Sequence, residues 1–482
     1  MIALDLLIGI PLLGVVACLF AARFDPSYAR VTALVASLGF AAALLSLTGE
    51  GIFAGEVVSG ISLARDSVPF WDLRIDGLSA PLLALTALLG PVAVLASWKV
   101  EERAAVHHAL LLALQAAVAG VFLAADVVLL YVFWEAVLIP MYFLIGVWGH
   151  EDRRHAAMKF FVYTFAGSAL MLVGILISVF TIGTTNIESL LAGRVALADP
   201  MLVFWLLAAG MLVKLPAFPL HTWLPDAHVE APTAGSILLA GVLLKMGGYG
   251  LLRLAIPIAP GPFADVAWVF AVLGGIGIVY GAMVALVQTD LKRLVAYSSV
   301  AHMGFVLLAL SAGGERGFSA AMLVMVSHGV IAPLLFLLVG QLYERTHTRE
   351  IARFGGLGSL VPRWGTALTF GALASLGLPG LSGFPGEFLA VIEGFGAWSW
   401  PVALALPGVV LAAAYNLRAV REVVHGEVAG EWAGISDLSI ADLIPVVMLA
   451  IAIVTLGVWP RFVLAMTGDI FAALALVIGT GA

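Results

Sequence analysis

Four ionisable side chains interrupt long apolar stretches of this sequence. They are Glu135, Lys214, Lys245 and Glu387, and each stands among aliphatic and aromatic residues. A cationic side chain at the centre of a membrane helix costs roughly 2.5 to 3.5 kcal/mol on insertion scales, so such groups usually face a partner or a water-filled cavity. Burial and facing charges change how readily each of them binds a proton. Their types and positions therefore predict a path for ions through a membrane.

Two histidines extend this set. His302 and His328 fall in later apolar stretches, and an imidazole, with an unperturbed pKa of about 6.5, gains or loses a proton near neutrality after a small change of surroundings. A single histidine in a helix is more often a satisfied core group, and the four charged residues would form static pairs on a purely structural interpretation. Several such groups in one apolar chain favour proton transfer.

The composition predicts a membrane protein built of helices. Apolar residues make up 62% and charged residues 11%, against roughly 45 to 50% and about 25% in soluble domains, and the mean hydropathy is +1.10. The apolar runs continue for about twenty residues, which indicates membrane helices and not an outer-membrane barrel. The formal net charge of -7 is spread over short loops, so no nucleic-acid partner is expected.

The sequence shows no means of binding a redox cofactor. Its single cysteine, Cys18, excludes a disulfide framework and an iron–sulfur cluster held by thiolates of this chain. It contains neither GxxxxGK[ST] nor GxGxxG between a strand and a helix. We therefore expect this chain to bind no cofactor and no metal.

The apolar runs predict an all-α chain of about fourteen membrane spans. The twelfth is too long for one straight helix, because Leu378-Pro379-Gly380 and Gly383-Phe384-Pro385-Gly386 interrupt it. Residues 461–482 are apolar but short, and we expect them to form a tail. The predicted spans lie near 2–22, 30–48, 79–98, 108–125, 127–149, 158–182, 201–223, 232–256, 264–288, 294–312, 317–343, 365–399, 401–424 and 439–459.

Two broken helices in comparable positions predict an internal repeat. Lys214 precedes a break at Pro216, and Glu387 follows a break at Pro385, each in a run of about five helices. Such interrupted spans mark the binding region of inverted-repeat transporters. The predicted fold is thus a polytopic bundle with two inverted five-helix repeats, each containing a broken helix. Its predicted units are 1–107 with the first three helices, 108–257 and 258–425 as the two repeats, and 426–482 with a C-terminal helix and tail.

The loop charges predict the orientation. Most of the lysine and arginine residues in the loops fall on one face of the predicted bundle when the N-terminus is placed outside. Because positively charged loops stay in the cytoplasm, both termini are expected on the outer side. In a bacterium this would be the periplasmic side of the inner membrane.

Four motifs resemble a known family. They are FWEAVLIPMYFLIGVWG at 133–149, KLPAFPLHTWLPDAHVEAPTAGSILLAGVLLKMGGYG at 214–250, DLKRLVAYSSVAHMGF at 290–305 and GFPGEF at 383–388. From about residue 79 to residue 425 the chain is similar to the antiporter-like membrane subunits of complex I, the proton-pumping NADH:quinone oxidoreductase. A glutamate at 387, where the two sister subunits have a lysine, favours the subunit M branch, also called chain 4.

The resemblance implies a role for each residue of a proton path. Glu135 resembles a fifth-helix glutamate that faces Lys214 and tunes its proton affinity, and Lys245 resembles a relay lysine. Glu101 or Glu102 resembles a further acidic position of the family, and the sequence does not distinguish them. The residues that the resemblance places on the path are Glu135, Lys214, His221, Lys245, His302, His328 and Glu387.

The resemblance also implies the function and the partners. We expect a non-redox subunit that translocates protons when electron transfer elsewhere in complex I perturbs Glu135 and Lys214. Its expected partners are the other membrane-arm subunits, including the two sister antiporter-like subunits, and the lipid bilayer. The alternatives are a subunit of a multi-subunit sodium/proton antiporter or membrane-bound hydrogenase, a structural scaffold with static buried pairs, and a free-standing solute carrier.

Overall fold

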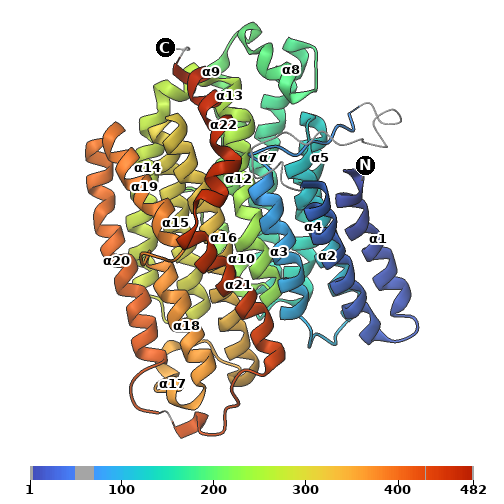
Figure 1. The fold of residues 1–482 in the computed structure, drawn as a ribbon, viewed down its shortest axis with the longest axis vertical. Helices are drawn as coiled ribbons and strands as arrows, with labels where there is room; N and C mark the ends of the chain where they lie inside the picture. The colour runs from blue at the N-terminus through green and yellow to red at the C-terminus, as the bar shows by residue number, and fades with distance from the viewer. Residues whose placement is uncertain (1–3, 49–69, 429, 480–482) are drawn as a thin grey trace.

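The computed structural model describes residues 4–48, 70–428 and 430–479, and these residues fold into an elongated bundle of helices (Figure 1). The first half of the chain contains α1 (Asp5–Ala21), α2 (Pro26–Thr48), α3 (Ala80–Ala96), α4 (Ala104–Leu123), α5 (Val127–Ala136), α6 (Leu138–Trp148), α7 (Arg153–Ile182), α8 (Ile187–Ala192), α9 (Pro200–Lys214), α10 (Trp223–Glu230) and α11 (Thr233–Leu238). The second half contains α12 (Leu244–Gly250), α13 (Ile256–Ile258), α14 (Pro260–Leu286), α15 (Leu291–Ala312), α16 (Gly314–Thr346), α17 (Leu357–Leu360), α18 (Pro362–Ser375), α19 (Gly383–Ala397), α20 (Ser399–Val423), α21 (Ile440–Val458) and α22 (Arg461–Gly479).

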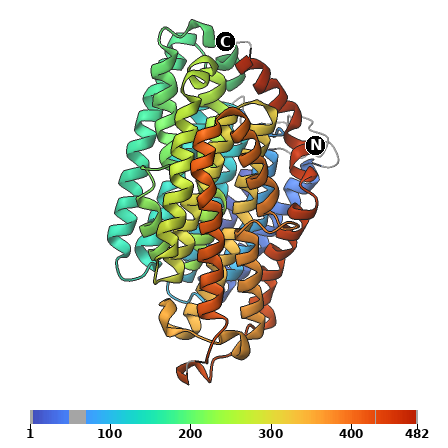
Figure 2. The ribbon, with the colours of Figure 1, turned by 90° about the vertical axis from the view of Figure 1, so that its left-hand side faces the viewer.

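The helices confirm an all-helical polytopic membrane protein. Within the described ranges, eleven spans are long and apolar enough to cross a membrane, and α1, α3 and α9 are shorter apolar helices. The centre of the bundle is formed by α15, α16 and the continuous helix Thr233–Ile258, which are almost entirely buried, whereas no more than about a third of the residues of α7, α21 and α22 are buried. Figure 2 shows the same bundle turned by 90° about its long axis, with most of the long helices running roughly along that axis. The exposed apolar helices are the surface that lipid can cover.

The two predicted breaks are present. After α9 ends at Lys214 the chain runs irregularly to α10, and after α18 ends at Ser375 it runs irregularly to α19. Pro216 and Pro379 lie in these breaks, because proline removes a backbone donor and clashes with the preceding turn. Pro385, predicted to break the second helix, instead lies in the first turn of α19, where its missing N–H costs nothing.

Two elements differ from the sequence-based prediction. In the fifth span the helical hydrogen-bond pattern is interrupted at Val137, between α5 and α6, because Pro140 cannot bond to the carbonyl of Ala136 and its ring crowds that carbonyl. The tail predicted after residue 460 is wrong over residues 461–479, which form helix α22. This helix packs along α16, and a side chain at Gly77 would collide with the Met466 carbonyl. Its apolar face is buried against neighbours that are distant in the sequence.

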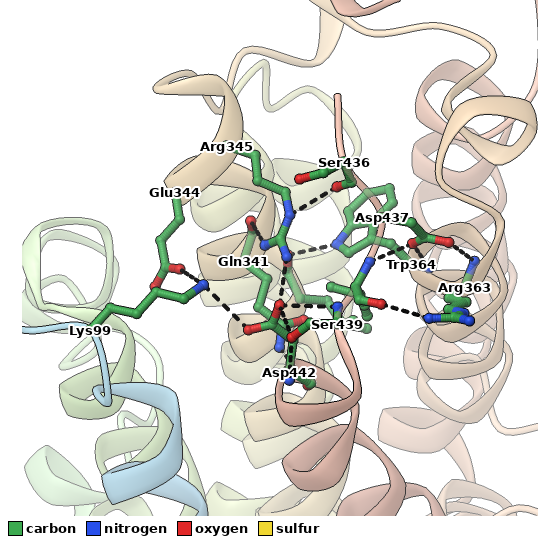
Figure 3. A network of polar contacts seen from close by, with 12 residues as sticks. Lys99, Gln341, Glu344, Arg345, Arg363, Trp364, Ser436, Asp437, Ser439 and Asp442 are labelled. Atoms are coloured by element: carbon green, nitrogen blue, oxygen red, sulfur yellow. Dashed lines mark hydrogen bonds and ion pairs between the residues drawn. The ribbon is translucent and has the colours of Figure 1, made fainter. Parts of the chain in front are cut away.

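The two ends of the bundle differ in their elements. The end that carries both chain termini, α8 and α13 is here named the terminal face, and the opposite end, with α17 and the loops 97–103, 149–152 and 424–439, the basic face (Figure 1). At the basic face a polar network joins α3, α16 and α21 (Figure 3). Lys99 Nζ lies 3.2 Å from Glu344 Oε2 and 3.3 Å from Asp442 Oδ1, and Arg345 Nη2 donates to Asp442 at 2.7 Å. The network holds the start of α21 against the end of α16.

Candidate functional site

A row of titratable side chains begins at Lys245 in the middle of the bundle. Lys245 is fully buried in α12, and its Nζ lies 2.6 Å from His328 Nδ1 and donates to the carbonyl of Ala240. The helix around Lys245 is not regular, because the π-helical segments Leu239–Leu243 and Leu251–Ala255 flank α12. Such segments often occur at functional sites, where they turn a side chain away from the regular helical direction.

The row continues through a second histidine to a glutamate. The rings of His328 in α16 and His302 in α15 have centroids 5.4 Å apart. His302 Nε2 lies 3.3 Å from Glu387 Oε1 and 3.2 Å from the Ser375 carbonyl, while its Nδ1 lies 2.7 Å from the Ser298 carbonyl. Glu387 is the fifth residue of α19, just beyond its first turn and shortly after the second break. Four helices therefore bring Lys245, His328, His302 and Glu387 together.

Lys214 and Glu135 form a separate pair next to the first break. Lys214 is 2% exposed, and its Nζ lies 5.9 Å from the ring centroid of Trp134 and 5.8 Å from that of Phe160. No hydrogen-bond acceptor for this Nζ lies among the described residues. Glu135 is the last residue but one of α5 and interacts electrostatically with Lys214, but the two do not approach within 4.0 Å. The aromatic faces hold the ammonium group where it can respond to the carboxylate.

The helix that carries Lys245 lies against the end of α9. A methyl group on Gly247 would come within 2.5 Å of the Leu215 nitrogen and the Met211 carbonyl oxygen. The backbone of α12 therefore touches the backbone at which α9 ends with Lys214. This contact connects the pair and the row through helix packing, without a direct side-chain contact.

His221 lies apart from both groups. It stands in the first break, where its ring is 5.7 Å from that of Phe218 and 5.1 Å from that of Tyr280. Its Nδ1 has no partner among the described side chains and backbone groups. The structure brings His221 to neither Lys245 nor Glu387, and its place on the path stays a prediction.

Two further buried groups were missed in the sequence. His228 in α10 is fully buried, and neither of its ring nitrogens has a partner in the described part of the chain. It interacts electrostatically with Lys245 and with Lys292, and Lys292 donates to the carbonyls of Val229 and Ala231. His228 belongs to the same motif as His221, HTWLPDAHVEAP, so its position seven residues later was a usable signal. Glu101 and Glu102 are exposed at the basic face.

The described residues contain no group of three histidine, cysteine or acidic side chains arranged to hold a metal ion. The chemistry that this arrangement offers is proton exchange. Amine, imidazole and carboxyl groups stand in sequence inside an apolar bundle, and each can bind and release a proton. The fold and the buried row define the class of antiporter-like, ion-translocating membrane subunits.

Comparison with known proteins gives the family. The family described as NADH:quinone oxidoreductase/Mrp antiporter, transmembrane, matches residues 124–413. NADH-quinone oxidoreductase subunit M of Rhodobacter capsulatus is 44% identical over 84% of this chain and 82% of its own length. Subunit M of Escherichia coli K12 is 40% identical over 95% and 94%. A chain of respiratory complex I from Thermus thermophilus superposes with a TM-score of 0.89 at 32% identity, covering 98% of this chain and 99% of that one.

The chain therefore belongs to the NADH:quinone oxidoreductase/Mrp antiporter family, in its NADH-quinone oxidoreductase subunit M, or chain 4, branch. This confirms the family inferred from the four sequence motifs, and with it a multi-pass membrane subunit of complex I. The match to subunit M over nearly the whole chain also favours this branch over the sodium/proton antiporter and hydrogenase alternatives.

Proposed function

We propose that this chain translocates protons as a membrane-arm subunit of NADH:quinone oxidoreductase, driven by electron transfer elsewhere in the complex. The observation that carries this proposal is the buried row Lys245, His328, His302 and Glu387, which crosses four helices with contacts of 2.6 Å and 3.3 Å at its two ends. A static core would satisfy these groups with fixed partners, whereas Nε2 of His328 has no partner among the described residues.

The geometry allows a proton to pass from Lys245 to His328. The Lys245 ammonium donates to His328 Nδ1, so the neutral histidine carries its hydrogen on Nε2. Transfer of a proton to Nδ1 makes the ring cationic, and release from Nε2 returns it to a neutral state. An imidazole with one accepting and one donating nitrogen is suited to such a relay.

His302 and Glu387 form the receiving end. His302 Nδ1 faces only the Ser298 carbonyl, so it carries a hydrogen. Nε2 then faces two oxygens, those of Ser375 and Glu387, and this contact is favourable only when a proton lies between the ring and an oxygen. The two side chains thus form a site that holds one extra proton.

The Glu135 and Lys214 pair is the proposed start of the path. Separation of the carboxylate from the ammonium removes the anion that favours the charged lysine, and Lys214 then releases its proton toward Lys245. His221 and His228 are proposed to join this path through water. The driving force comes from outside the chain, which is proposed to contact the other membrane-arm subunits, among them the two sister antiporter-like subunits.

The loops support the proposed inverted repeats. Asp126 caps α5 and forms an isolated bridge with Asn186, and Asp290 caps α15 and forms an isolated bridge with Glu350. The two residues of each bridge are the same number of positions apart in the sequence, from 126 to 186 and from 290 to 350, and the two bridges lie at opposite ends of the bundle. An inverted pair of five-helix units, each with a broken helix, would produce this arrangement. We propose that the basic face is cytoplasmic and both termini are periplasmic in a bacterial inner membrane.

The test is Lys214→Met in the assembled complex. We expect quinone reduction and proton pumping to fall together, because the variant cannot release the first proton. Lys99→Met is the matched control, since Lys99 is 62% exposed at its side chain and its surface pairs contribute little. Wild-type rates of both reactions in the Lys214 variant would refute the proposal. Unchanged pumping after neutral substitution of Glu135, Lys214, Lys245 and Glu387 would instead support a static scaffold.

A further inference from the structure

An ion pair and a tyrosine lie between Lys245 and the terminal face. Lys245 and Tyr249 are four residues apart in α12, and Arg253, in the π-helical segment that follows, bonds to the Tyr249 hydroxyl, so the three residues follow one another along the same continuous helix. Four residues of helix rise by about 6 Å. Only about two turns therefore separate the relay lysine from Arg253.

Arg253 is held by three hydrogen bonds. Its Nη1 and Nη2 donate to the two carboxylate oxygens of Asp76 at 2.7 Å and 2.6 Å, and its Nε donates to the Tyr249 hydroxyl at 3.0 Å. The Tyr249 hydroxyl in turn donates to the Phe122 carbonyl at 3.3 Å. The guanidinium carbon also lies 5.2 Å from the centroid of the tyrosine ring. Bidentate geometry of this kind fixes the arginine in position.

A polar cavity reaches this pair from the terminal face. Its volume is about 160 Å³, and its polar lining consists of Arg74, Asp76, Asn186, Glu188 and Arg253. A cavity of this size with several polar partners has room for ordered water. Phe122, which also lines the cavity, meets the ring of Tyr249 edge to face at 5.1 Å, and the two side chains are 1% and 0% exposed. The cavity therefore extends to Arg253, and its lining includes neither Tyr249 nor Lys245.

The hydrogen bonds do not offer a route for protons. A relay group must accept a proton on one side and donate one on the other, and arginine does not lose its proton in proteins. Burial raises the pKa of Asp76, but the Arg253 guanidinium and the amides of Ser79 and Leu78 outweigh this effect and hold it below its ordinary value, so the carboxylate stays ionised. The two opposite charges balance, so the pair is neutral and its polar atoms are already hydrogen-bonded, which leaves no group that could take up a proton and pass it on.

We propose that Asp76, Arg253 and the rings of Tyr249 and Phe122 form a proton seal between Lys245 and the terminal face. The seal makes transfer to His328 the open route for a proton on Lys245, and it prevents loss of that proton directly to the outer side. This inference rests on the proposed function of Lys245 as a relay. It assigns to the ion pair a role in coupling that is distinct from proton transfer itself.

The test measures passive proton leak without turnover. Purified complex carrying Asp76→Asn and Arg253→Gln together is placed in proteoliposomes, a pH gradient is imposed without NADH, and its decay is followed with a pH-sensitive dye. Changing both partners avoids an uncompensated buried charge. We expect the gradient to decay severalfold faster than with the wild-type complex. With Arg74→Gln as the control, the pH gradient should decay at the wild-type rate. Arg74 lies on the rim of the same cavity, and its side chain pairs with the exposed Glu188.

A third substitution distinguishes a specific leak from general damage. Adding Lys245→Met to the double variant should restore slow decay, because the proposed leak passes through Lys245. A leak that persists in the triple variant, or wild-type decay in the double variant, overturns the proposal. Should the double variant fail to assemble, Tyr249→Ser removes the ring but leaves the ion pair, and the same outcomes apply. These results leave the Lys214→Met test unaffected, so the two proposals can fail separately.

Discussion

At the residue scale, His328 links Lys245 to His302, which in turn contacts Glu387. One of its nitrogens contacts Lys245 at 2.6 Å, and its ring stands 5.4 Å from that of His302. Lys245 and Glu387 are contributed by different helices, and within the described residues no hydrogen bond or ion pair joins them directly. The row therefore depends on one imidazole that can both accept and release a proton.

We expect His328→Gln to abolish most of the proton pumping. Glutamine is polar and of similar size, so it can keep the contact with Lys245, but it does not carry a proton at neutral pH. The measurement is proton uptake by membrane vesicles per NADH oxidised. His155→Gln, at an exposed position near the start of α7, should pump like the wild type. Normal pumping in the His328 variant would show that protons bypass this histidine.

At the element scale, close backbone packing determines where the charged groups stand. Helix α12 meets the end of α9 at Gly247, and α14 meets α15 at Gly274 and Gly304, each with backbone atoms where a side chain would otherwise stand. Contacts of this type are common between membrane helices, because small residues let backbones approach. The contact at Gly247 fixes the position of Lys214, since Leu215 directly follows it.

We expect Gly247→Ala to lower stability and pumping together. Its methyl group would lie 2.5 Å from two backbone atoms that cannot turn away, and overpacking of this kind costs about 1 to 3 kcal/mol. Gly9→Ala is the control, because no described atom lies within 4 Å of its added methyl group, and alanine is the better helix former by roughly 1 kcal/mol. Thermal unfolding of the purified complex compares the stability of the two variants. Equal melting temperatures in the two variants would contradict the packing argument.

At the scale of the whole molecule, polar interactions are collected at the two ends of an apolar bundle. At the basic face the network around Asp442 joins α16 to α21, and at the terminal face Asp76 joins the loop before α3 to the helix that carries Lys245 (Figure 3 shows the former). Between these ends the buried row runs from helix to helix across the bundle.

The orientation can be tested by cysteine labelling. Val195, 90% exposed near the terminal face, and Glu151, exposed at the basic face, are each replaced by cysteine. The one native cysteine, Cys18, is buried, so the background is low. With a membrane-impermeant maleimide on intact cells, we expect Val195→Cys to be labelled directly and Glu151→Cys only after permeabilisation. The reverse pattern would place the basic face outside and refute the proposed topology.

The sequence was informative about the spans because each of them is apolar over its whole length. Lys214, Lys245 and Glu387 were recognisable because a charge in such a stretch is rare, and the broken helices because Pro216 and Pro379 cannot be accommodated in a regular helix. The interruption at Val137 also has a local cause, Pro140, which the sequence-based prediction did not use. These features depend on residues that are close together along the chain.

The sequence by itself determined the membrane class, the family and the charged residues inside the bundle. Only the tertiary structure decided that His328 touches Lys245 across 83 residues and that Arg253 pairs with Asp76 across 177. It alone also showed that residues 461–479 form a helix against α16 and that His228 is wholly buried. The physical reason is that hydropathy and helix breaking act locally, whereas a proton contact requires two side chains within about 3 Å, which depends on how distant helices pack.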